Sequence, residues 1–589
     1  MEEVALISLM AVLVLLSATC SIVLGKLKMP SLIGFLVAGI IIANTMVIDD
    51  DAHTVIEVFS NLGLILLMFS IGMEIDVRKL RSQGKYAMIV SAIQLPLMVL
   101  GGMLTGHLLG FDMLQSLCLG CIISGSSTAV VMAVLKSQGK LDKDDIESLI
   151  LVIIIEDIGQ VIMLSMLTPM LSGSGMSTDA LIILIIKIAV FMVACFTIGL
   201  YIIPRIIDWC YRRANDELIS LLCIGIAFLF ALLANLMGLS VAIGAFLAGV
   251  FVSMAKPHHT VEGFVEPLKS VFMAMFFISV GMEVVIGTLA DNIVPILVIF
   301  ASFAIFKTVT VYLGVWVANG DSRKGLISAI SLCAMGEFAF IIAKEALSEG
   351  VVDDAFYSSV IGAALLSMIC LPFMSKYSDK LYDGLTAKMP KLLARFFAWM
   401  TRHRDNVYNA LGTLSAKTVK SFTNGLANVY VTTILAVIVE VAFFYAYDPL
   451  CAWLVPNFGG DDFTWRIVIL VVNLIVLLYP LVRLVKSLRV SLYILDAGKK
   501  KIDESEHAKD KENTYKFHET MSPLLIGASI DIIVVMLVPN GIDNMVHIYV
   551  SLALVAVLII SQYIVHKKGM VTHVPDIDEK EEEQPAQTE

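Results

Sequence analysis

The chain has 589 residues, of which 58% are hydrophobic and 16% are charged, and its mean hydropathy is +0.87. Soluble domains of ordinary composition are far more polar, so these values indicate a protein that is embedded in lipid. The formal net charge of −11 arises from acidic loops and from the acidic segment 576–589. Nothing in this pattern indicates a nucleic-acid partner, and none is expected.

The apolar stretch 4–24 follows Glu2 and Glu3 rather than the basic residues of a secretory signal, so we expect a retained helix. The nine cysteines lie mostly in apolar segments and do not form the framework of a secreted disulfide protein. Cys118 and Cys121 form a CxxC pair. Since no other Cys or His lies nearby at metal-binding spacing, we interpret them as packing residues rather than a redox or metal site.

Apolar windows of about 20 residues, the length that crosses the hydrocarbon core, recur with short polar breaks. Thirteen are predicted before Met374, at 4–24, 32–48, 55–73, 86–109, 115–136, 146–168, 180–203, 218–236, 239–254, 269–285, 292–318, 325–347 and 354–374.

The loops between these spans alternate in charge. One set carries Lys26, Lys28, Arg78, Lys79, Arg81, Lys85, Lys136, Arg212, Arg213, Lys256, Arg323 and Lys324, and the other carries Asp49, Asp50, Asp51, Asp291, Asp353 and Asp354. The positive-inside rule places the basic set in the cytoplasm. We therefore expect an integral multi-pass protein of the cell membrane with its N-terminus outside and its C-terminus cytoplasmic.

Beyond the first membrane domain, residues 1–376, three further parts are predicted. Residues 377–426 form a basic, amphipathic cytoplasmic linker with KLLARFFAWMTRHR at its centre. Residues 427–566 form an accessory transmembrane bundle with four spans, at 427–446, 464–484, 522–539 and 545–565, and residues 567–589 form an acidic disordered tail. No GxGxxG motif occurs, so neither a nucleotide-binding domain nor a cofactor is expected.

Three charged residues fall at one depth of the predicted membrane. Asp157, Lys307 and Glu337 each lie about 11 or 12 residues from a cytoplasmic helix end, which corresponds to roughly 16 to 18 Å at 1.5 Å per residue. A charge inside a membrane helix costs several kcal/mol, so such residues are candidates for an ion or proton pathway.

Two spans contain a break at this depth. The fifth carries SGSSTAVV, in which Ser126, Ser127 and Thr128 interrupt an apolar helix, and the twelfth has small residues at 334–336. Breaks of this kind free backbone groups and point half-helix ends at a cavity. If the seventh span is a linker, spans one to six and eight to thirteen form two inverted repeats with the broken helix fifth in each, a pattern typical of secondary transporters.

These residues resemble the monovalent cation:proton antiporter-2 superfamily, which includes Kef-type and Nap-type exchangers. The resemblance covers about residues 5–375, and its motifs are KMPSLIGFLVAGIIIA, LILLMFSIGMEID, SGSSTAVVMAVL, IIEDIGQV, VAIGAFLAGVFVS, MFFISVGMEV and MGEFAFIIAKEA. It implies an all-α membrane fold of 13 helices, with two inverted repeats and crossed broken helices. About four extra C-terminal helices are added to it here, and residues 1–376 are the cation/proton antiporter domain.

The resemblance also implies an ion site. Asp157 matches the ion-binding aspartate of the family, and Glu156 and Lys307 match the residue before it and its lysine partner. The Glu-Asp pair differs from the two aspartates that are commonest in the family and from the Gln-Asp pair of Kef-type members.

A carboxylate at this depth accepts either a proton or a cation, and competition combined with alternating access gives exchange. The predicted function is therefore exchange of Na⁺ or K⁺ for H⁺ across the lipid membrane, with a role in pH homeostasis and no enzymatic activity. Two alternatives on the same scaffold are a cation channel or uniporter and a non-transporting ion or pH sensor.

Several residue roles have more than one interpretation. Glu156 either takes part in proton binding or holds Lys307, and Lys307 is either a charge partner in transport or a structural one. Glu337 either lines the helix crossing or satisfies freed backbone N–H groups. Ser126, Ser127 and Thr128 either coordinate a cation or bond carbonyls of their own helix.

Other residues have less direct interpretations. Gly102, Gly106 and Gly110 have small-xxx-small spacing, which favours helix packing within the chain over a homodimer contact, although a homodimer stays an alternative. Glu440 and Asp531, in the accessory spans, form either a structural pair or a proton-linked one.

Overall fold

The computed structural model describes residues 3–26, 29–46, 50–75, 84–172, 199, 201–237, 239–459 and 461–503. In these ranges all regular structure is helical, and the one β-bridge joins Ser126 to Met335. The chain divides into two compact units, Met1–Met389 and Pro390–Glu589. The prediction of an all-α membrane fold is confirmed.

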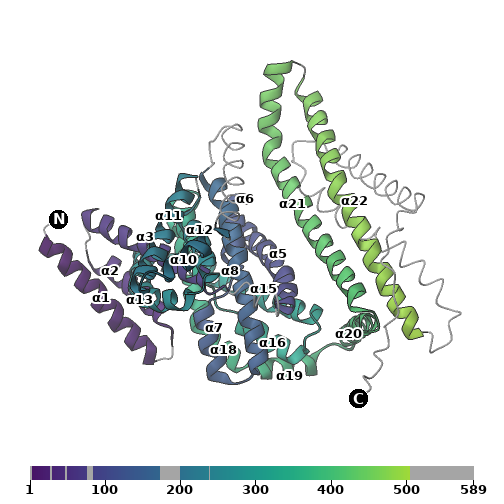
Figure 1. Cartoon of the computed structure of the whole chain (residues 1–589), viewed down its shortest axis with the longest axis horizontal. Helices are drawn as coiled ribbons and strands as arrows, with labels where there is room; N and C mark the ends of the chain where they lie inside the picture. Colours follow the sequence, from purple (N-terminus) through teal and green to yellow (C-terminus); the bar gives the residue numbers. More distant parts are fainter. Residues whose placement is uncertain are drawn as a thin grey trace. The chain divides into compact units, whose positions relative to one another are not determined.

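The helices of the first unit follow one another closely along the chain (Figure 1). They are α1 (Glu3–Lys26), α2 (Ser31–Thr45), α3 (Asp50–Met73), α5 (Lys85–Leu108), α6 (Met113–Ile122), α7 (Thr128–Gln138), α8 (Lys143–Ser172), α10 (Ile203–Tyr211), α11 (Asp216–Leu236), α12 (Val241–Ser253), α13 (His258–Met282), α14 (Ile286–Asp291), α15 (Ile293–Val317), α16 (Ser322–Ser331), α17 (Glu337–Ser348), α18 (Asp354–Lys376) and α19 (Ser378–Lys388).

Both predicted helix breaks are present. The fifth span is divided into α6 and α7 by residues 123–127, and the twelfth into α16 and α17 by residues 332–336. Within the described ranges, eight helices are long and apolar enough to cross a membrane. The predicted seventh span, 180–203, lies almost wholly outside the described residues.

One helix is longer than its hydropathy predicts. Helix α13 begins at His258, whereas the apolar window begins at 269. The extra turns carry Glu262, Glu266 and Lys269, of which Lys269 and Glu266 form an ion pair of 2.8 Å at i,i+3 spacing. Helical hydrogen bonding continues through this polar segment because helix formation does not require the apolar side chains that mark a membrane window.

Polar side chains fix where several helices begin. Asp112 accepts a hydrogen bond from the backbone N–H of Gln115, whose side chain bonds back to the N–H of Asp112, so this pair forms a capping box at α6. Asn215, Asp321 and Asp353 cap α11, α16 and α18 in the same way through their side-chain oxygens. These caps satisfy N–H groups that a helix leaves unpaired at its start.

The helices of the first unit pack as two bundles, which Figure 1 shows with α1, α2, α3 and α13 on one side and α5, α15 and α16 on the other. We call α1–α3 with α11–α13 the scaffold bundle, and α5–α8 with α15–α18 the core bundle. Each predicted repeat contributes three spans to each bundle. This division is the one expected if two inverted repeats interlock.

The scaffold bundle is held together by glycine contacts. A Cβ atom on Gly72 of α3 would lie 2.2 Å from the carbonyl oxygen of Phe246, and one on Gly249 of α12 would lie 2.1 Å from that of Phe69. Helices α2 and α13 make the same kind of reciprocal contact through Gly39. Small residues allow backbones to approach closely where lipid supplies no hydrophobic driving force.

Glycine has the same role between α5 and α6. A Cβ on Gly102 would meet the backbone of Gly120 at 2.4 Å, and one on Gly106 would meet Ser116 at 2.7 Å. Gly110 lies beyond the end of α5 with a φ of 84°, and a Cβ added to it would meet nothing within 4 Å. The predicted packing within the chain is therefore confirmed for the first two glycines, whereas Gly110 serves as a left-handed turn residue.

Basic residues join loops at one end of the first unit, which we call the basic end. Lys324, before the twelfth span, bonds Asp142 and Asp145, before the sixth, at 2.8 Å each. Lys140 bonds the carbonyl oxygens of Ser375 and Lys376, where α18 ends. These contacts join loops of one predicted repeat to loops of the other.

The second unit contains α20 (Lys391–Gly412), α21 (Ala416–Phe458) and α22 (Asp462–Asp503). Helices α21 and α22 pack along each other, and α20 packs against α22. Leu414, Phe422 and Ile494 form a buried apolar cluster within this unit. The predicted spans 522–539 and 545–565, Asp531 and the acidic tail lie outside the described residues.

The glycine contacts give a stability prediction. We expect Gly72→Ala to lower the free energy of unfolding by about 1–3 kcal/mol, because the new Cβ meets a backbone oxygen that no side-chain rotation can move away. Thermal denaturation in detergent measures this change. The matched control is Gly225→Ala on α11, where an added Cβ would meet nothing within 4 Å. Equal melting temperatures of the two variants would contradict the expectation.

Candidate functional site

The two helix breaks cross and bond to each other. The backbone N–H of Ser127 donates to the carbonyl oxygen of Ala334 at 2.9 Å, and the hydroxyl of Ser126 donates to that of Leu332 at 2.9 Å. A Cβ on Gly336 would lie 2.8 Å from the carbonyl oxygen of Ser126, so the crossing requires a glycine there. Backbone groups freed by one break are thus satisfied by the other.

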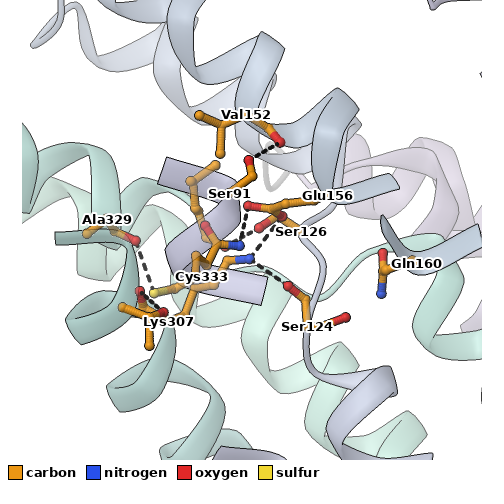
Figure 2. Close-up of polar contacts among 12 residues, drawn as sticks. Ser91, Ser124, Ser126, Val152, Glu156, Gln160, Lys307, Ala329 and Cys333 are labelled. Carbon is orange, nitrogen blue, oxygen red and sulfur yellow. Dashed lines mark hydrogen bonds and ion pairs between the residues drawn. The ribbon is translucent and has the colours of Figure 1, made fainter. Parts of the chain in front are cut away.

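Lys307 joins the crossing to α8. Its ammonium group donates to the carbonyl oxygen of Ser124 at 3.0 Å and forms an ion pair with Glu156 at 2.9 Å, as Figure 2 shows. Ser124 follows the end of α6, where unpaired carbonyls give a helix its negative end. The lysine therefore neutralises both a carboxylate and the end of a half-helix.

Glu156 is fully occupied by protein partners. One carboxylate oxygen pairs with Lys307, and the other accepts a hydrogen bond of 2.6 Å from the side-chain amide of Gln94 on α5. The side chains of Glu156 and Lys307 are both 0% exposed. A buried ion pair is tolerated when the remaining oxygens are bonded in this way.

Asp157 has a different environment, although it is the next residue on α8. Its side chain is 9% exposed. Among the described residues, none donates a hydrogen bond to its carboxylate or forms an ion pair with it. The charged groups that act on it are Glu337, Glu156, Glu74 and Lys307, of which three are acidic. This carboxylate is therefore available to a cation or a proton.

The two other acids of this group lie at a helix start and at the basic end. Glu337 is the first residue of α17 and is half-buried, so its carboxylate lies at the positive end of that half-helix. Glu74 follows the last residue of α3 and is exposed. The protein that surrounds Glu74 nevertheless raises its pKa to about 7, mainly through desolvation, while Lys269 acts in the opposite direction.

Buried oxygen atoms near the crossing lack hydrogen-bond partners among the described residues. They are the hydroxyl oxygen of Ser127 and the side-chain amide oxygens of Gln94 and Gln160, all of which are on fully buried side chains. Ser126 differs, since its hydroxyl is engaged with Leu332. Thr128 is half-buried and begins α7. An unpaired buried oxygen is costly unless a ligand or water binds it, so Ser127 is the hydroxyl best placed for coordination.

The comparison with known families agrees with this geometry. Residues 12–376 match the family model described as sodium/hydrogen exchanger, transmembrane. The chain belongs to this exchanger family. The match ends where α18 ends, so the second unit lies outside it.

Three relatives are similar to the chain over more than half of its length. It is 27% identical over 355 residues to the Na⁺/H⁺-K⁺ antiporter GerN of Bacillus cereus, covering 60% of this chain and 91% of that protein. It is 28% identical over 360 residues to a Na⁺/H⁺ antiporter of Enterococcus hirae, covering 60% and 93%. The glutathione-regulated potassium-efflux protein KefC of Enterobacter is 30% identical over 354 residues, covering 59% and 56%.

A solved structure supports the fold. The sodium proton antiporter MjNhaP1 of Methanocaldococcus jannaschii superimposes with a TM-score of 0.51 and 15% identity, covering 65% of this chain and 98% of that one. The predicted superfamily resemblance is confirmed by the family match and these relatives, and the superposition confirms the predicted exchanger fold.

Sequence reasoning named Asp157, Glu156 and Lys307 but missed two amides. The structure pairs Glu156 with Lys307 and bonds Lys307 to Ser124 beside the crossing, and the role of Asp157 stays a prediction. Gln94 and Gln160 were not predicted, although each is a polar amide inside an apolar span, and Gln160 follows Asp157 by three residues on the same helix. A search for buried amides as well as charges would have found them.

The buried pair makes a prediction about stability. We expect Lys307→Met to destabilise the folded protein by about 3–5 kcal/mol, because Glu156 then keeps a buried charge without its partner. The double variant Glu156→Gln, Lys307→Met should recover much of this loss, since it removes both charges. Melting temperatures of the two variants in detergent test the pair, and a double variant no more stable than the single one would contradict it.

Proposed function

We propose that the chain is a secondary antiporter that exchanges Na⁺ or K⁺ for H⁺ by alternating access, with Asp157 as the shared binding residue. The observation that carries this proposal is the contrast between two adjacent carboxylates. Glu156 is paired with Lys307 and bonded by Gln94, whereas no described residue bonds the carboxylate of Asp157. Only the second carboxylate is free to change its occupant.

Competition at Asp157 couples the two fluxes. A carboxylate in a low-dielectric site binds a proton or a cation, but not both at once, because each neutralises the same charge. The acidic neighbours of Asp157 favour occupation by a positive charge. Loading by a proton on one side of the membrane and displacement by a cation on the other complete one exchange cycle.

The position of helix α8, which carries Asp157, supports alternating access. Helix α8 belongs to the core bundle and also packs against α12 of the scaffold bundle. The core helices are bound to one another by the crossing and by the pair of Lys307 and Glu156. The core bundle can therefore move against the scaffold bundle as one body. The hydroxyl of Ser127 would supply a further oxygen ligand to the dehydrated cation, and Glu337 would act as a second acid at the crossing.

We further propose that the protein lies in the cell membrane with the basic end in the cytoplasm. The lysines and arginines in the loops of that end support this orientation. The cytoplasmic end is then the one at which α8 begins, and the opposite end, where α17 finishes, is external.

The central test replaces the free carboxylate. We expect Asp157→Asn to reduce cation-dependent proton movement in liposomes to the level of protein-free liposomes, since an amide cannot exchange a proton for a cation. The measurement imposes a pH gradient, adds Na⁺ or K⁺, and follows internal pH. The matched control is Asp144→Asn, an exposed acid in the first turn of the same helix, which should keep wild-type exchange. Full exchange by Asp157→Asn would reject the proposal.

Removing the positive partner should change the pH dependence. Lys307→Gln removes the positive side chain that favours the ionised forms of the carboxylates. The transported ion then displaces protons from the site only at a lower proton concentration. The activity profile is therefore expected to move to higher pH. Proton flux measured across a pH series checks this shift, and a profile that coincides with that of the wild type would remove Lys307 from the exchange chemistry.

A further inference from the structure

A second lysine joins the core bundle to the scaffold bundle. Lys344 lies on α17, and its ammonium group donates to the hydroxyl oxygen of Ser279 on α13 at 3.0 Å and to that of Ser60 on α3 at 3.3 Å. The side chains of Ser60 and Ser279 are 1% and 6% exposed. This charged contact is separate from the pair at Lys307.

Neighbouring contacts close the same part of the interface. The hydroxyl of Tyr357 on α18 donates to the carbonyl oxygen of Val280 at 3.1 Å. The rings of Phe277 on α13 and Phe340 on α17 meet edge to face, with centroids 5.6 Å apart. All four residues are 0% exposed. At the basic end, in contrast, Glu74 is exposed.

The partners of Lys344 are weak ones for a buried charge. Among the described residues, no carboxylate lies within ion-pair distance of its ammonium group, and it donates hydrogen bonds to two neutral hydroxyls. Such bonds are worth much less than the desolvation of an ammonium ion costs. Glu283 and Glu57 act on its charge from a greater distance and keep contact with solvent. The lysine is thus held in a contact that separates readily.

We propose that Lys344 is a positioning residue that latches α17 of the core to α3 and α13 of the scaffold, closing the external end of the transport pathway. The proposal rests on the alternating-access function given above. When the core moves to expose Asp157 externally, α17 separates from the two serines, and the ammonium group becomes hydrated beside Glu283 and Glu57. Lys344 binds no transported ion and acts only on which end is open.

Cysteine accessibility tests the latch. Ser279→Cys places a thiol at the contact, and a membrane-impermeant maleimide is added outside intact cells that express the full chain, with labelling located by peptide mass spectrometry. In the native background the thiol should react slowly. We expect Lys344→Met to raise its labelling rate several-fold, because the closed arrangement loses its bond, and Lys344→Arg to restore the slow rate. The control Lys256→Met, which removes an exposed lysine from the basic end, should leave the rate unchanged.

The outcomes distinguish a latch from a lysine that only stabilises the fold. They also distinguish failure of the latch from failure of the proposed function. An equal labelling rate of the introduced thiol in the native, Lys344→Met and Lys344→Arg backgrounds overturns the proposal. If Lys344→Met does not fold, Ser60→Ala removes the other hydroxyl partner and takes its place, with the same rise expected and the same equality overturning it. Labelling does not require ion flux, so its result stands even where liposomes containing the native chain show no exchange.

Discussion

The burial of charge in a low-dielectric interior is the constraint on which the rest of this structure depends. Lys307 and Glu156 are both fully buried, and each is tolerable only because the other is there and because Ser124 and Gln94 supply the remaining bonds. This arrangement occupies Glu156, which is one carboxylate of the adjacent acidic pair. It leaves the other, Asp157, in a mostly negative environment in which no described residue bonds its carboxylate, and the proposed exchange rests on that difference.

The need to satisfy buried polar groups also explains why the two helix breaks cross. A helix interrupted inside a membrane exposes backbone groups that lipid cannot satisfy. Here one break satisfies the other through Ser127 and Ala334, while Lys307 takes the carbonyl oxygen of Ser124. The crossing therefore has a stabilising role as well as a functional one. It also joins the core helices into a body that can move without losing its own hydrogen bonds.

Contacts within the bundles differ from contacts between them, and this difference suits the bundles to relative motion. The scaffold uses glycine contacts in which backbones touch directly, which resist sliding because no side chain can yield. Across the interface between the bundles, the described polar contacts are few and bond neutral groups, as Lys344 does with Ser60 and Ser279. Strong contacts thus lie within each bundle, and readily broken ones lie between them.

The sequence by itself determined the helices, both breaks and the charged residues at mid-depth. Hydropathy, small-residue interruptions and the cost of a charge in a membrane span are properties of a single segment, so they can be read without knowing its neighbours. Only the tertiary structure decided that Lys307 pairs with Glu156, 151 residues away, and that Gln94 completes this pair. It also decided which serine hydroxyl at the crossing lacks a partner among the described residues and that Lys344 reaches the scaffold. These outcomes depend on which faces of distant helices meet, and a linear pattern does not contain that information.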